Sequence, residues 1–366
     1  MLKLSKCGIG ELEVLKIPFS QESIGSSPIS GMNEKIMKKK LICGIGNALV
    51  DSEYKVTDTE IADLSLTKGC MELNDQENHM RLLSHLNETH GSVKMMPGGS
   101  VANSLYTLSQ FGVDASFIGR VSDDVAGNSF IKSLEKVGIK ACIDQVDVGI
   151  TGECLVLITP DHERTMYTHL GVSSDLNKDD IDQNMIKNSR YLLIEGYLVT
   201  SDSTKNVALH ALDIAIESET KKVITLSDPN VIKFFRDNMM ELLHKNFDMV
   251  FCNKQEALNI SMKDNIEDAI DFLKNYSSEI IITSGSEGAY VICNDERAHE
   301  IPEKVSPVDL TGAGDMFLAS YIFAKINQKS LSDCVRFANR CAGEVIQEYG
   351  AKLDSDSAYK RLYESL

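Results

Sequence analysis

The feature that most restricts the fold of this chain is an alternation of short apolar segments with longer helical patterns. The first apolar segment, residues 41–46, ends in glycine and suits a buried strand followed by a turn. Strands that alternate with helices form βαβ units, so we expect an α/β fold with a mainly parallel central sheet flanked by helices. Further strands are expected at 115–118, 191–195, 222–226, 249–253 and 280–283, and helices at 128–137, 203–218, 266–275, 316–326 and 331–349.

A second group of segments alternates only partly and is interrupted by turn residues. Its members are residues 69–73, 93–96, 153–158 and 164–168. Short strands bounded by turn residues favour a small separate sheet. We predict that this sheet is a discontinuous lid, built from about residues 51–73, 92–97 and 150–169, on a domain that spans residues 36–366.

The first 35 residues differ in composition from the rest of the chain. Ser, Pro and Gly are frequent in residues 20–31, and no apolar centre of a signal peptide is present in this part of the sequence. We expect residues 1–35 to form a loosely ordered extension, with Met32 and Met37 as alternative start sites.

Charge and composition argue against several classes of partner. The formal net charge of −17 opposes binding to nucleic acid or to an anionic membrane, because both need a basic surface. No stretch approaches the roughly 20 apolar residues that span a bilayer. The nine cysteines stand singly, and no spacing of Cys or His fits a zinc site. We therefore expect a cytoplasmic protein with reduced thiols and small-molecule partners.

The strongest chemical signal is Asp309–Asp315, which reads DLTGAGD. Its two glycines allow a tight turn, and the residues after them can open a helix whose free N–H groups face an anion. Asp315 falls in the first turn of that helix, where a carboxylate can accept a proton from an attacking hydroxyl. An Asp there also favours the helix dipole without any chemistry. We interpret the stretch as a phosphotransferase active site.

Two other groups of polar residues are candidates for binding a sugar. The glycine pair Gly98–Gly99 permits close approach of the backbone to a ligand, and Asn103 in the following helix can donate to and accept from hydroxyl groups. Asn47 and Asp51 stand beyond the end of the first strand, where open parallel sheets bind ligands. The simpler alternatives are a solvated Asn at a helix start and an Asn in a turn.

Asn253–Glu256 could serve a metal ion. Asn253 closes a strand and Glu256 begins a helix, so both polar groups can lie above the sheet near phosphate oxygens, where a hard cation prefers oxygen ligands. A helix cap with a Glu in the first turn explains the same residues.

In order along the chain, Gly98–Gly99 with Asn103, the run 118–127, and Asp309–Asp315 resemble the two signatures of the ribokinase or PfkB family. The resemblance extends from about residue 41 to the C-terminus. It implies an α/β core with a β-sheet lid, and ATP-dependent phosphorylation of an alcohol on a sugar or nucleoside. Leu310 departs from the more usual Thr or Pro, and we expect the N–H geometry of the loop to be unaffected.

The resemblance also implies a role for each matched residue. Asp315 would be the catalytic base, and the anion hole would be formed by Gly312, Ala313 and Gly314. The sugar would be bound by Asp51, Gly99 and Asn103, and we expect Asn47, Gly98 and Arg164 to bind the substrate as well, although a surface ion pair beside Glu163 explains Arg164 equally well. Mg²⁺ would be organised, through water, by Asn253 and Glu256. The ATP would be contacted by these two residues and by Thr283, Gly285, Gly288 and Asn339, although residues 283–288 could equally form an ordinary hairpin loop.

Residues 46–51, GNALVD, resemble the pattern of adenosine kinase-like members of the family more than that of the sugar kinases. We therefore expect transfer to the 5′-hydroxyl of a nucleoside, such as adenosine to AMP, by a monomer or a homodimer. A sugar kinase of the ribose, fructose or 2-keto-3-deoxygluconate type, or a catalytically silent nucleoside sensor, is the alternative. A dinucleotide-binding fold is disfavoured because Leu49 stands where its fingerprint needs a third glycine.

Overall fold

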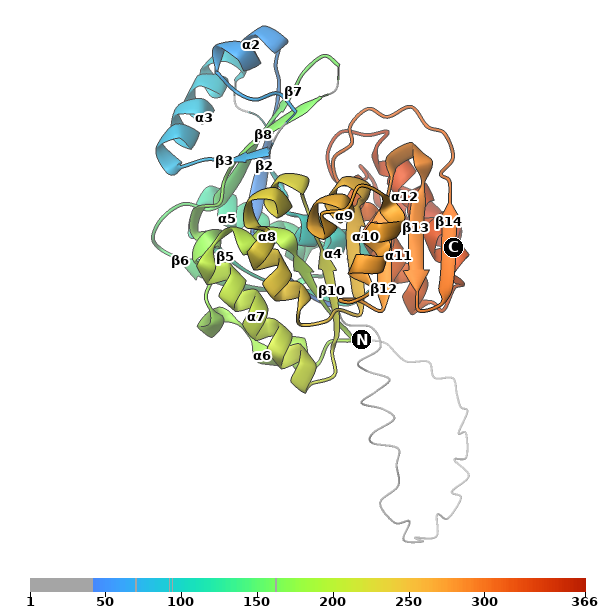
Figure 1. The fold of residues 1–366 in the computed structure, drawn as a ribbon. Helices are drawn as coiled ribbons and strands as arrows, with labels where there is room; N and C mark the ends of the chain where they lie inside the picture. The colour runs from blue at the N-terminus through green and yellow to red at the C-terminus, as the bar shows by residue number, and fades with distance from the viewer. Residues whose placement is uncertain (1–41, 70, 92, 94, 162) are drawn as a thin grey trace, which may run out of the picture. The chain divides into compact units, whose positions relative to one another are not determined.

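The computed structural model describes residues 42–69, 71–91, 93, 95–161 and 163–366, and the predicted extension of residues 1–35 lies outside them. The larger sheet of this part of the chain has nine strands (Figure 1). Its order is β14 (Glu296–Glu300), β13 (Ala289–Cys293), β12 (Glu279–Thr283), β11 (Met249–Asn253), β10 (Lys221–Thr225), β9 (Tyr191–Glu195), β1 (Ile42–Ile45), β5 (Ala115–Ser122) and β6 (Lys140–Val146).

Strand pairing in this sheet is parallel from β6 through β12, and β13 and β14 are added antiparallel. The prediction of a mainly parallel central sheet is therefore confirmed. Sequence reasoning located β9 and β11 at their observed bounds but did not predict β6 or β14.

Helices cover both faces of the larger sheet because its strands are apolar on both sides. Successive residues of one strand pack in different cores: Ile42 belongs to one and Cys43 to the other. The first core is completed by α4 (Ser100–Gln110), α5 (Val125–Lys136), α11 (Ala313–Ile326), α12 (Leu331–Val345) and α13 (Asp356–Glu364). The second is completed by α6 (Gln183–Lys187), α7 (Asp202–Glu217), α8 (Pro229–Leu243), α9 (Lys254–Ser261) and α10 (Ile266–Leu273).

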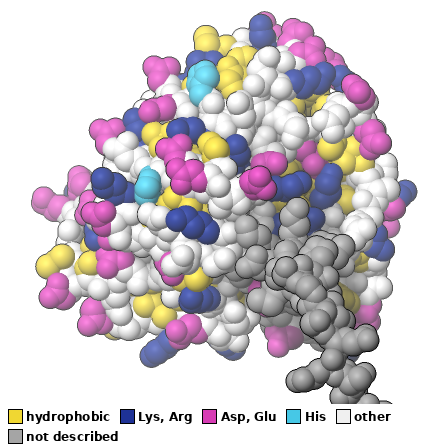
Figure 2. Space-filling model, turned by 90° about the horizontal axis from the view of Figure 1, so that it is seen from below, with side chains coloured by type: hydrophobic (Ala, Val, Ile, Leu, Met, Phe, Trp, Pro, Cys, Tyr) yellow, Lys and Arg dark blue, Asp and Glu magenta, His cyan; other side chains and the backbone are white. Residues whose placement is uncertain are grey.

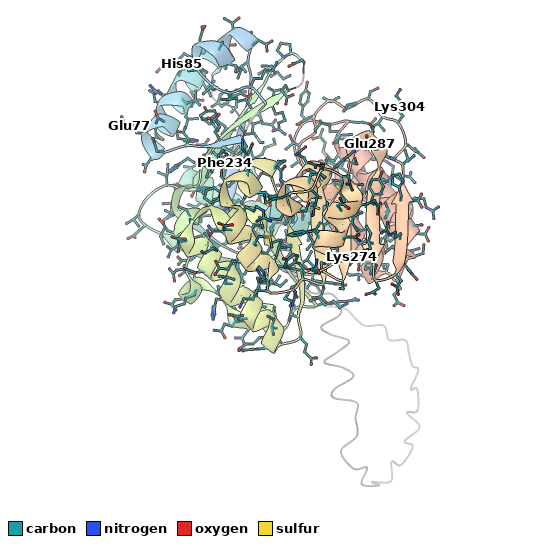
Figure 3. The ribbon with its side chains drawn as sticks, viewed as in Figure 1. Glu77, His85, Phe234, Lys274, Glu287 and Lys304 are labelled. Carbon is teal, nitrogen blue, oxygen red and sulfur yellow. The ribbon has the colours of Figure 1, made fainter. Side chains whose placement is uncertain are left out.

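A second, smaller sheet has five strands in the order β3 (Met71–Leu73), β8 (Arg164–His169), β7 (Gly152–Ile158), β2 (Leu49–Lys55) and β4 (Met95–Pro97). Its existence was predicted, but two helices between its strands were not: α2 (Asp58–Asp63) and α3 (Gln76–His90). Leu82 and Leu86 of α3 pack on this sheet, whereas Glu77 and His85 point away from it (Figure 3). The small sheet is thus covered on one face by its own helices.

The predicted helix 331–349 ends at Val345. The carbonyl oxygen of the next residue, Ile346, accepts the N–H groups of Val308 and Asp309 at 2.7 and 3.2 Å. The chain leaves the helix here because this carbonyl is used by the loop that precedes α11.

No helix in the described ranges is both long and apolar enough to cross a membrane. On the face shown in Figure 2, basic and acidic side chains lie interspersed rather than segregated.

Candidate active site

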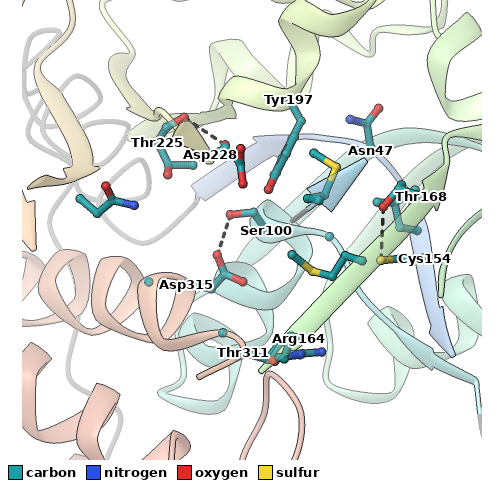
Figure 4. A pocket seen from close by; sticks show the side chains of 18 of the residues that line it. Asn47, Ser100, Cys154, Arg164, Thr168, Tyr197, Thr225, Asp228, Thr311 and Asp315 are labelled. Carbon is teal, nitrogen blue, oxygen red and sulfur yellow. Dashed lines mark hydrogen bonds between the residues drawn. The ribbon is translucent and has the colours of Figure 1, made fainter. Parts of the chain in front are cut away.

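A cavity of about 520 Å³ lies between the small sheet and the C-terminal ends of the parallel strands (Figure 4). The small sheet contributes β2, β3, β7 and β8, and the larger sheet contributes the ends of β10, β11 and β12. The N-terminus of α11 completes the wall. Ligands of open α/β folds bind at this edge of the sheet, so the cavity is the candidate active site.

Asp315 lies in the first turn of α11 and lines this cavity. Ser100 Oγ donates to its Oδ1 at 2.6 Å, and Asn103 Nδ2 donates to its Oδ2 at 3.0 Å. Burial raises the pKa of Asp315 to about 6, although the two hydrogen bonds and the charge of Lys352 act in the opposite direction. The carboxylate is therefore positioned, and each oxygen keeps a lone pair for a further proton.

The glycine turn before Asp315 has the geometry that an anion site requires. Gly312 caps α11 with φ of 72°, and a Cβ there would come within 2.5 Å of Ala351 Cα. Within the described residues, nothing approaches within 4 Å the point where Gly314 would carry a Cβ. Free N–H groups at the start of a helix favour a phosphate, so this turn is suited to receive one.

Asn47 lies across the cavity from Asp315, and Asp51 lines the cavity from the start of β2 (Figure 4). Asn47 is 2% exposed, yet neither its Oδ1 nor its Nδ2 makes a hydrogen bond of standard geometry in the part of the chain that the structure describes, although its side chain lies close enough to Glu195 to lower the pKa of that carboxylate. Burial raises the pKa of Asp51 to about 7, opposed by the charges of Lys352 and Arg164. Buried polar atoms without partners are rare, so the Asn47 side chain indicates a polar ligand, and Asp51 lines the same part of the cavity.

The Gly98–Gly99 turn lies directly against these residues. A Cβ at Gly98 would come within 2.2 Å of the Asp51 carboxylate, and one at Gly99, whose φ is 89°, within 2.6 Å of the carbonyl oxygen of Asn47. Gly99 thus requires glycine, because its φ is positive and a Cβ would meet backbone, whereas a Cβ at Gly98 would displace the Asp51 carboxylate.

Sequence reasoning did not identify Glu195, at the end of β9, as part of the site. This carboxylate is 1% exposed and accepts the N–H groups of Asn47 at 2.7 Å and Val101 at 3.1 Å. Burial raises its pKa to about 7. Glu195 therefore connects the loop after β1 to the start of α4. The sequence around Glu195 gives one indication of this role, namely an acidic residue at the end of a buried strand.

Asn253 and Glu256 line the cavity and form a reciprocal capping box at the start of α9. Asn253 donates from its backbone N to Glu256 Oε2 at 2.9 Å and from Nδ2 to Oε1 at 2.7 Å. The helix-cap alternative is thus correct as a description of the contacts, and Glu256 lines the cavity although it is only 4% exposed. Asp228, at the start of α8, and Thr283, at the end of β12, also line it.

Arg164 of β8 lies at the cavity wall but is engaged in ion pairs. Its Nη1 donates to Asp309 Oδ1 at 3.0 Å, and its Nη2 lies 3.5 Å from Glu53 Oε1. Asp309 also accepts the N–H groups of Thr311 and Gly350. Arg164 therefore joins the small sheet to the loop that carries the glycine turn.

The remaining sequence-predicted residues lie outside the cavity lining. Gly98, Asn103 and Ala313 stand behind it, in contact with or adjacent to residues that line it. Gly285 and Gly288 lie in the hairpin between β12 and β13, so the hairpin alternative is correct as a description of the chain path. Asn339 of α12 donates to the carbonyl oxygen of Glu300 at 2.8 Å and borders a separate cavity. The Asn103 side chain is 5% exposed, so the solvated alternative is wrong.

Tyr197 is a further lining residue that the sequence did not reveal. It follows β9, and its side chain points into the cavity between Asp228 and Asn47 (Figure 4). Burial raises its pKa, and the carboxylates of Asp228, Glu256, Glu195 and Asp315 act in the same direction. The phenol is therefore held in its neutral form, as a hydrogen-bond donor.

The two sheets, the helix layers and a carboxylate at the N-terminus of α11 define a ribokinase-like α/β protein. The model of the pfkB family of carbohydrate kinases matches residues 70–358. The chain belongs to this family, and family membership implies a kinase that uses ATP and has a hydroxyl group as acceptor.

Several relatives and solved structures are similar to this chain. An adenosine kinase from Sinorhizobium meliloti superposes with a TM-score of 0.82 and is 28% identical, covering 88% of this chain and 99% of that one. A probable sugar kinase from Rhizobium etli superposes equally well, with a TM-score of 0.82, 27% identity and coverage of 88% and 98%. The ribokinase of Dictyostelium discoideum is 26% identical over 71% of this chain and 86% of its own length.

Proposed function

We propose that this chain transfers the γ-phosphoryl group of ATP to the 5′-hydroxyl of a nucleoside, with adenosine as the preferred acceptor. The observation that carries the proposal is the composition of one cavity. Asp315 and the glycine turn lie on one side, unpartnered polar atoms of Asn47 lie on the other, and an apolar surface of the small sheet lies beside them.

The apolar surface distinguishes a nucleoside from a simple sugar. It consists of side chains from the small sheet and its flanks, namely Leu49, Met71, Leu73, Cys154, Met166 and Leu170. A free ribose carries hydroxyl groups around its ring and would leave this surface without a partner, whereas a purine base presents an apolar face to it. The similarity to the adenosine kinase of Sinorhizobium meliloti supports the same substrate.

In the proposed reaction the residues of this chain orient the acceptor and move one proton. Asp51 and Asn47 hold the ribose hydroxyls, and the 5′-oxygen faces the terminal phosphorus. Asp315 accepts the proton of that hydroxyl as the new O–P bond forms and the bond to ADP breaks. The N–H groups of the Gly312–Gly314 turn bind the equatorial oxygens of the transferred group. Filling the cavity with nucleoside excludes water as a competing acceptor.

Mg²⁺ fits the donor set of the ATP side only through water. The oxygens of Glu256 are engaged by Asn253 but retain lone pairs, and the carboxylate of Asp228 lies nearby on the same wall. When bound, Mg²⁺ would neutralise charge on the phosphates of the nucleotide. The hairpin at Thr283 is proposed to contact the nucleotide as well, whereas Asn339, which borders a separate cavity, is not assigned this role.

The test is release of ADP by the purified full-length protein with ATP, Mg²⁺ and a panel of acceptors. The panel contains adenosine, inosine, guanosine, ribose, fructose 6-phosphate and 2-keto-3-deoxygluconate. We expect kcat/KM for adenosine to exceed that for the sugars by at least about a hundredfold. A sugar lacks the base and therefore loses its contacts with the apolar surface, which are worth several kcal/mol. A preference for a sugar would reject the nucleoside, and calorimetric binding of adenosine without ADP release would identify a sensor.

We also propose that the small sheet closes over the acceptor and that the protein acts as a monomer in the cytoplasm. The outer face of this sheet is covered by α2 and α3 of the same chain, which opposes dimerisation through that face. The seven cysteines described as free thiols suit a reducing compartment. Light scattering tests the monomer, and protection from proteolysis by adenosine plus a nonhydrolysable ATP analogue tests closure. Unchanged cleavage sites and rates would reject a moving lid.

A further inference from the structure

The short segment Gly350–Lys352, which follows α12, packs against the loop that carries the glycine turn. The N–H group of Gly350 donates to Asp309 Oδ2 at 2.7 Å. The Cα of Ala351 lies 2.5 Å from the point where Gly312 would carry a Cβ. This segment therefore supports the anion-binding turn from behind.

Lys352 links the same segment to the substrate side of the site. Its Nζ donates to the carbonyl oxygen of Pro97 at 2.5 Å, and Pro97 is the residue immediately before the Gly98–Gly99 turn. The ammonium also lies over the ring of Tyr106, 4.9 Å from the centroid. Lys352 does not line the cavity as the described residues define it, so it acts from behind the wall.

The charge of Lys352 faces two carboxylates of the site. Burial lowers its pKa to about 8, and the charges of Asp51 and Asp315 oppose this change. The same ammonium lowers the pKa of Asp51 and of Asp315, each of which burial has raised. One half-buried cation thus interacts with the proposed sugar-binding carboxylate and with the proposed base.

Other charged and titratable groups share this environment. Asp51 is also influenced by the guanidinium of Arg164 and by the carboxylate of Glu53, and Asp315 acts on the carboxylate of Glu195. Arg164 is held by two carboxylates, Asp309 and Glu53. Lys352 is thus the cation whose charge reaches both Asp51 and Asp315 within the described residues.

We propose that Lys352 is a positioning residue for phosphoryl transfer: its ammonium offsets the paired charges of Asp51 and Asp315 and fixes the Gly98–Gly99 turn through Pro97. This inference rests on the proposed function, because it assigns the lysine a role in a reaction that uses Asp315 as base. Lys352 would contact neither the acceptor nor ATP.

The first experiment compares the pH dependence of kcat/KM for Lys352→Met, Lys352→Arg and the unchanged protein. Without the cation, both carboxylates ionise at higher pH, so the acidic limb of Lys352→Met should move upward by about one pH unit or more. At pH 7 its kcat/KM should fall by about tenfold and should recover as the pH rises. Lys352→Arg retains the positive charge, so its acidic limb of kcat/KM should lie at the same pH as that of the unchanged protein.

A matched control is available at Lys55, whose Nζ lies over the ring of Tyr349, 4.8 Å from the centroid. Lys55→Met removes a similar cation and ring contact outside the site, and it should leave the pH profile unchanged. If Lys352→Met lowers kcat/KM equally at every pH, the lysine has only a structural role and the proposal is overturned.

The second experiment needs no kinase activity. Lysine labelled with ¹³C at Cε is incorporated into the full-length protein, and the Lys352 signal is assigned by its absence from Lys352→Arg. We expect this ammonium to titrate near pH 8, and at lower pH in Asp51→Asn because an opposing carboxylate has been removed. An unchanged titration in Asp51→Asn overturns the proposal. If the titration of Lys352 depends on Asp51 but no alcohol is phosphorylated, the proposed function is wrong, whereas the interaction between Lys352 and Asp51 is supported.

Discussion

The two ends of α11 hold carboxylates in contrasting ways. Toward its C-terminus, Lys325 donates to both oxygens of Glu279 at 2.9 Å, and the Tyr321 hydroxyl donates to the same carboxylate. At its N-terminus, Asp315 also receives two hydrogen bonds, but it borders a cavity. The neighbouring Asn103 Oδ1 has no partner among the described residues.

The difference separates a structural cluster from a candidate site. Around Glu279 the polar atoms of the cluster satisfy one another, so their contribution is to the stability of the fold. Around Asp315 several buried polar atoms have unused hydrogen-bonding capacity. Leaving such atoms unpaired costs free energy unless a ligand bonds to them. Among the described residues, His79, Ser116 and Ser320 also carry buried polar atoms without a partner, but none of them lines the cavity. Incomplete satisfaction together with a cavity, rather than burial of a carboxylate, therefore indicates function here.

The largest expected effect tests the base. Asp315→Asn should lower kcat by about a thousandfold or more, because an amide cannot accept the proton of the acceptor hydroxyl. The KM for the acceptor should change only a few-fold, since Ser100 and Asn103 keep polar partners. Steady-state kinetics measure both constants. Lys325→Met, at the other end of the helix, is the control and should leave kcat unchanged; turnover near the normal rate in Asp315→Asn would remove this residue from the mechanism.

A smaller loss is expected when the donor behind the base is removed. Asn103→Ala deletes a hydrogen bond that lowers the pKa of Asp315, so that pKa should rise above its value of about 6. Because the ionised form is the active one, the acidic limb of kcat/KM should move to higher pH, and the rate at pH 7 should fall by about tenfold to a hundredfold.

Ser104→Ala is a matched control for this change, since Ser104 lies one residue away and its Oγ donates only to the backbone oxygen of Asp315, at 3.2 Å. In Ser104→Ala the acidic limb of kcat/KM should stay at the pH of the unchanged protein. A change confined to the KM for ATP in Asn103→Ala would show that Asn103 serves the nucleotide instead.

At the structural end of α11, stability rather than rate should respond. Lys325→Met leaves the carboxylate of Glu279, whose side chain is 6% exposed, with fewer donors. Because Lys325 itself is 28% exposed, part of its interaction is screened, and we expect a loss of about 1–2 kcal/mol in the free energy of unfolding. Urea unfolding followed by circular dichroism measures this loss. If Lys325→Met has a normal urea midpoint but a reduced kcat, the C-terminal end of α11 serves catalysis and its assignment as structural is wrong.

The sequence was sufficient for features that a local pattern encodes. The parallel strands are continuous apolar runs, and the Asp309–Asp315 turn places an acid after two glycines, so both could be predicted without coordinates. Helix α3 was missed because most of its residues are polar, and only Leu82, Leu86 and His79 of it are buried.

The contacts that complete the site could not be predicted, because they join distant parts of the chain. Asn103 contacts Asp315 across 212 residues, Lys352 contacts Pro97 across 255, and Arg164 contacts Asp309 across 145. A lone lysine or a glutamate at a strand end carries no local signal of such a contact. Arg164 lines the cavity and forms ion pairs, but with the distant Asp309 and Glu53 rather than with the adjacent Glu163 that the sequence suggested.

The smallest effect concerns the nucleotide side, where the polar groups are almost as fully paired as those around Glu279. Burial raises the pKa of Glu256 to about 8, so its carboxylate gains its full charge only beside a cation. Glu256→Gln keeps the size of the side chain but removes this charge and one of the two hydrogen bonds from Asn253, so the Mg²⁺ concentration for half-maximal rate should rise by up to about tenfold. Titration of the rate with Mg²⁺ at saturating acceptor measures this shift, while the KM for adenosine should stay the same. Glu267→Gln in α10 is the control, because Glu267 is exposed, is paired with Arg297 and does not line the cavity. If both variants respond alike, the cavity wall at α9 is structural in the same sense as the far end of α11, and the metal must be held elsewhere.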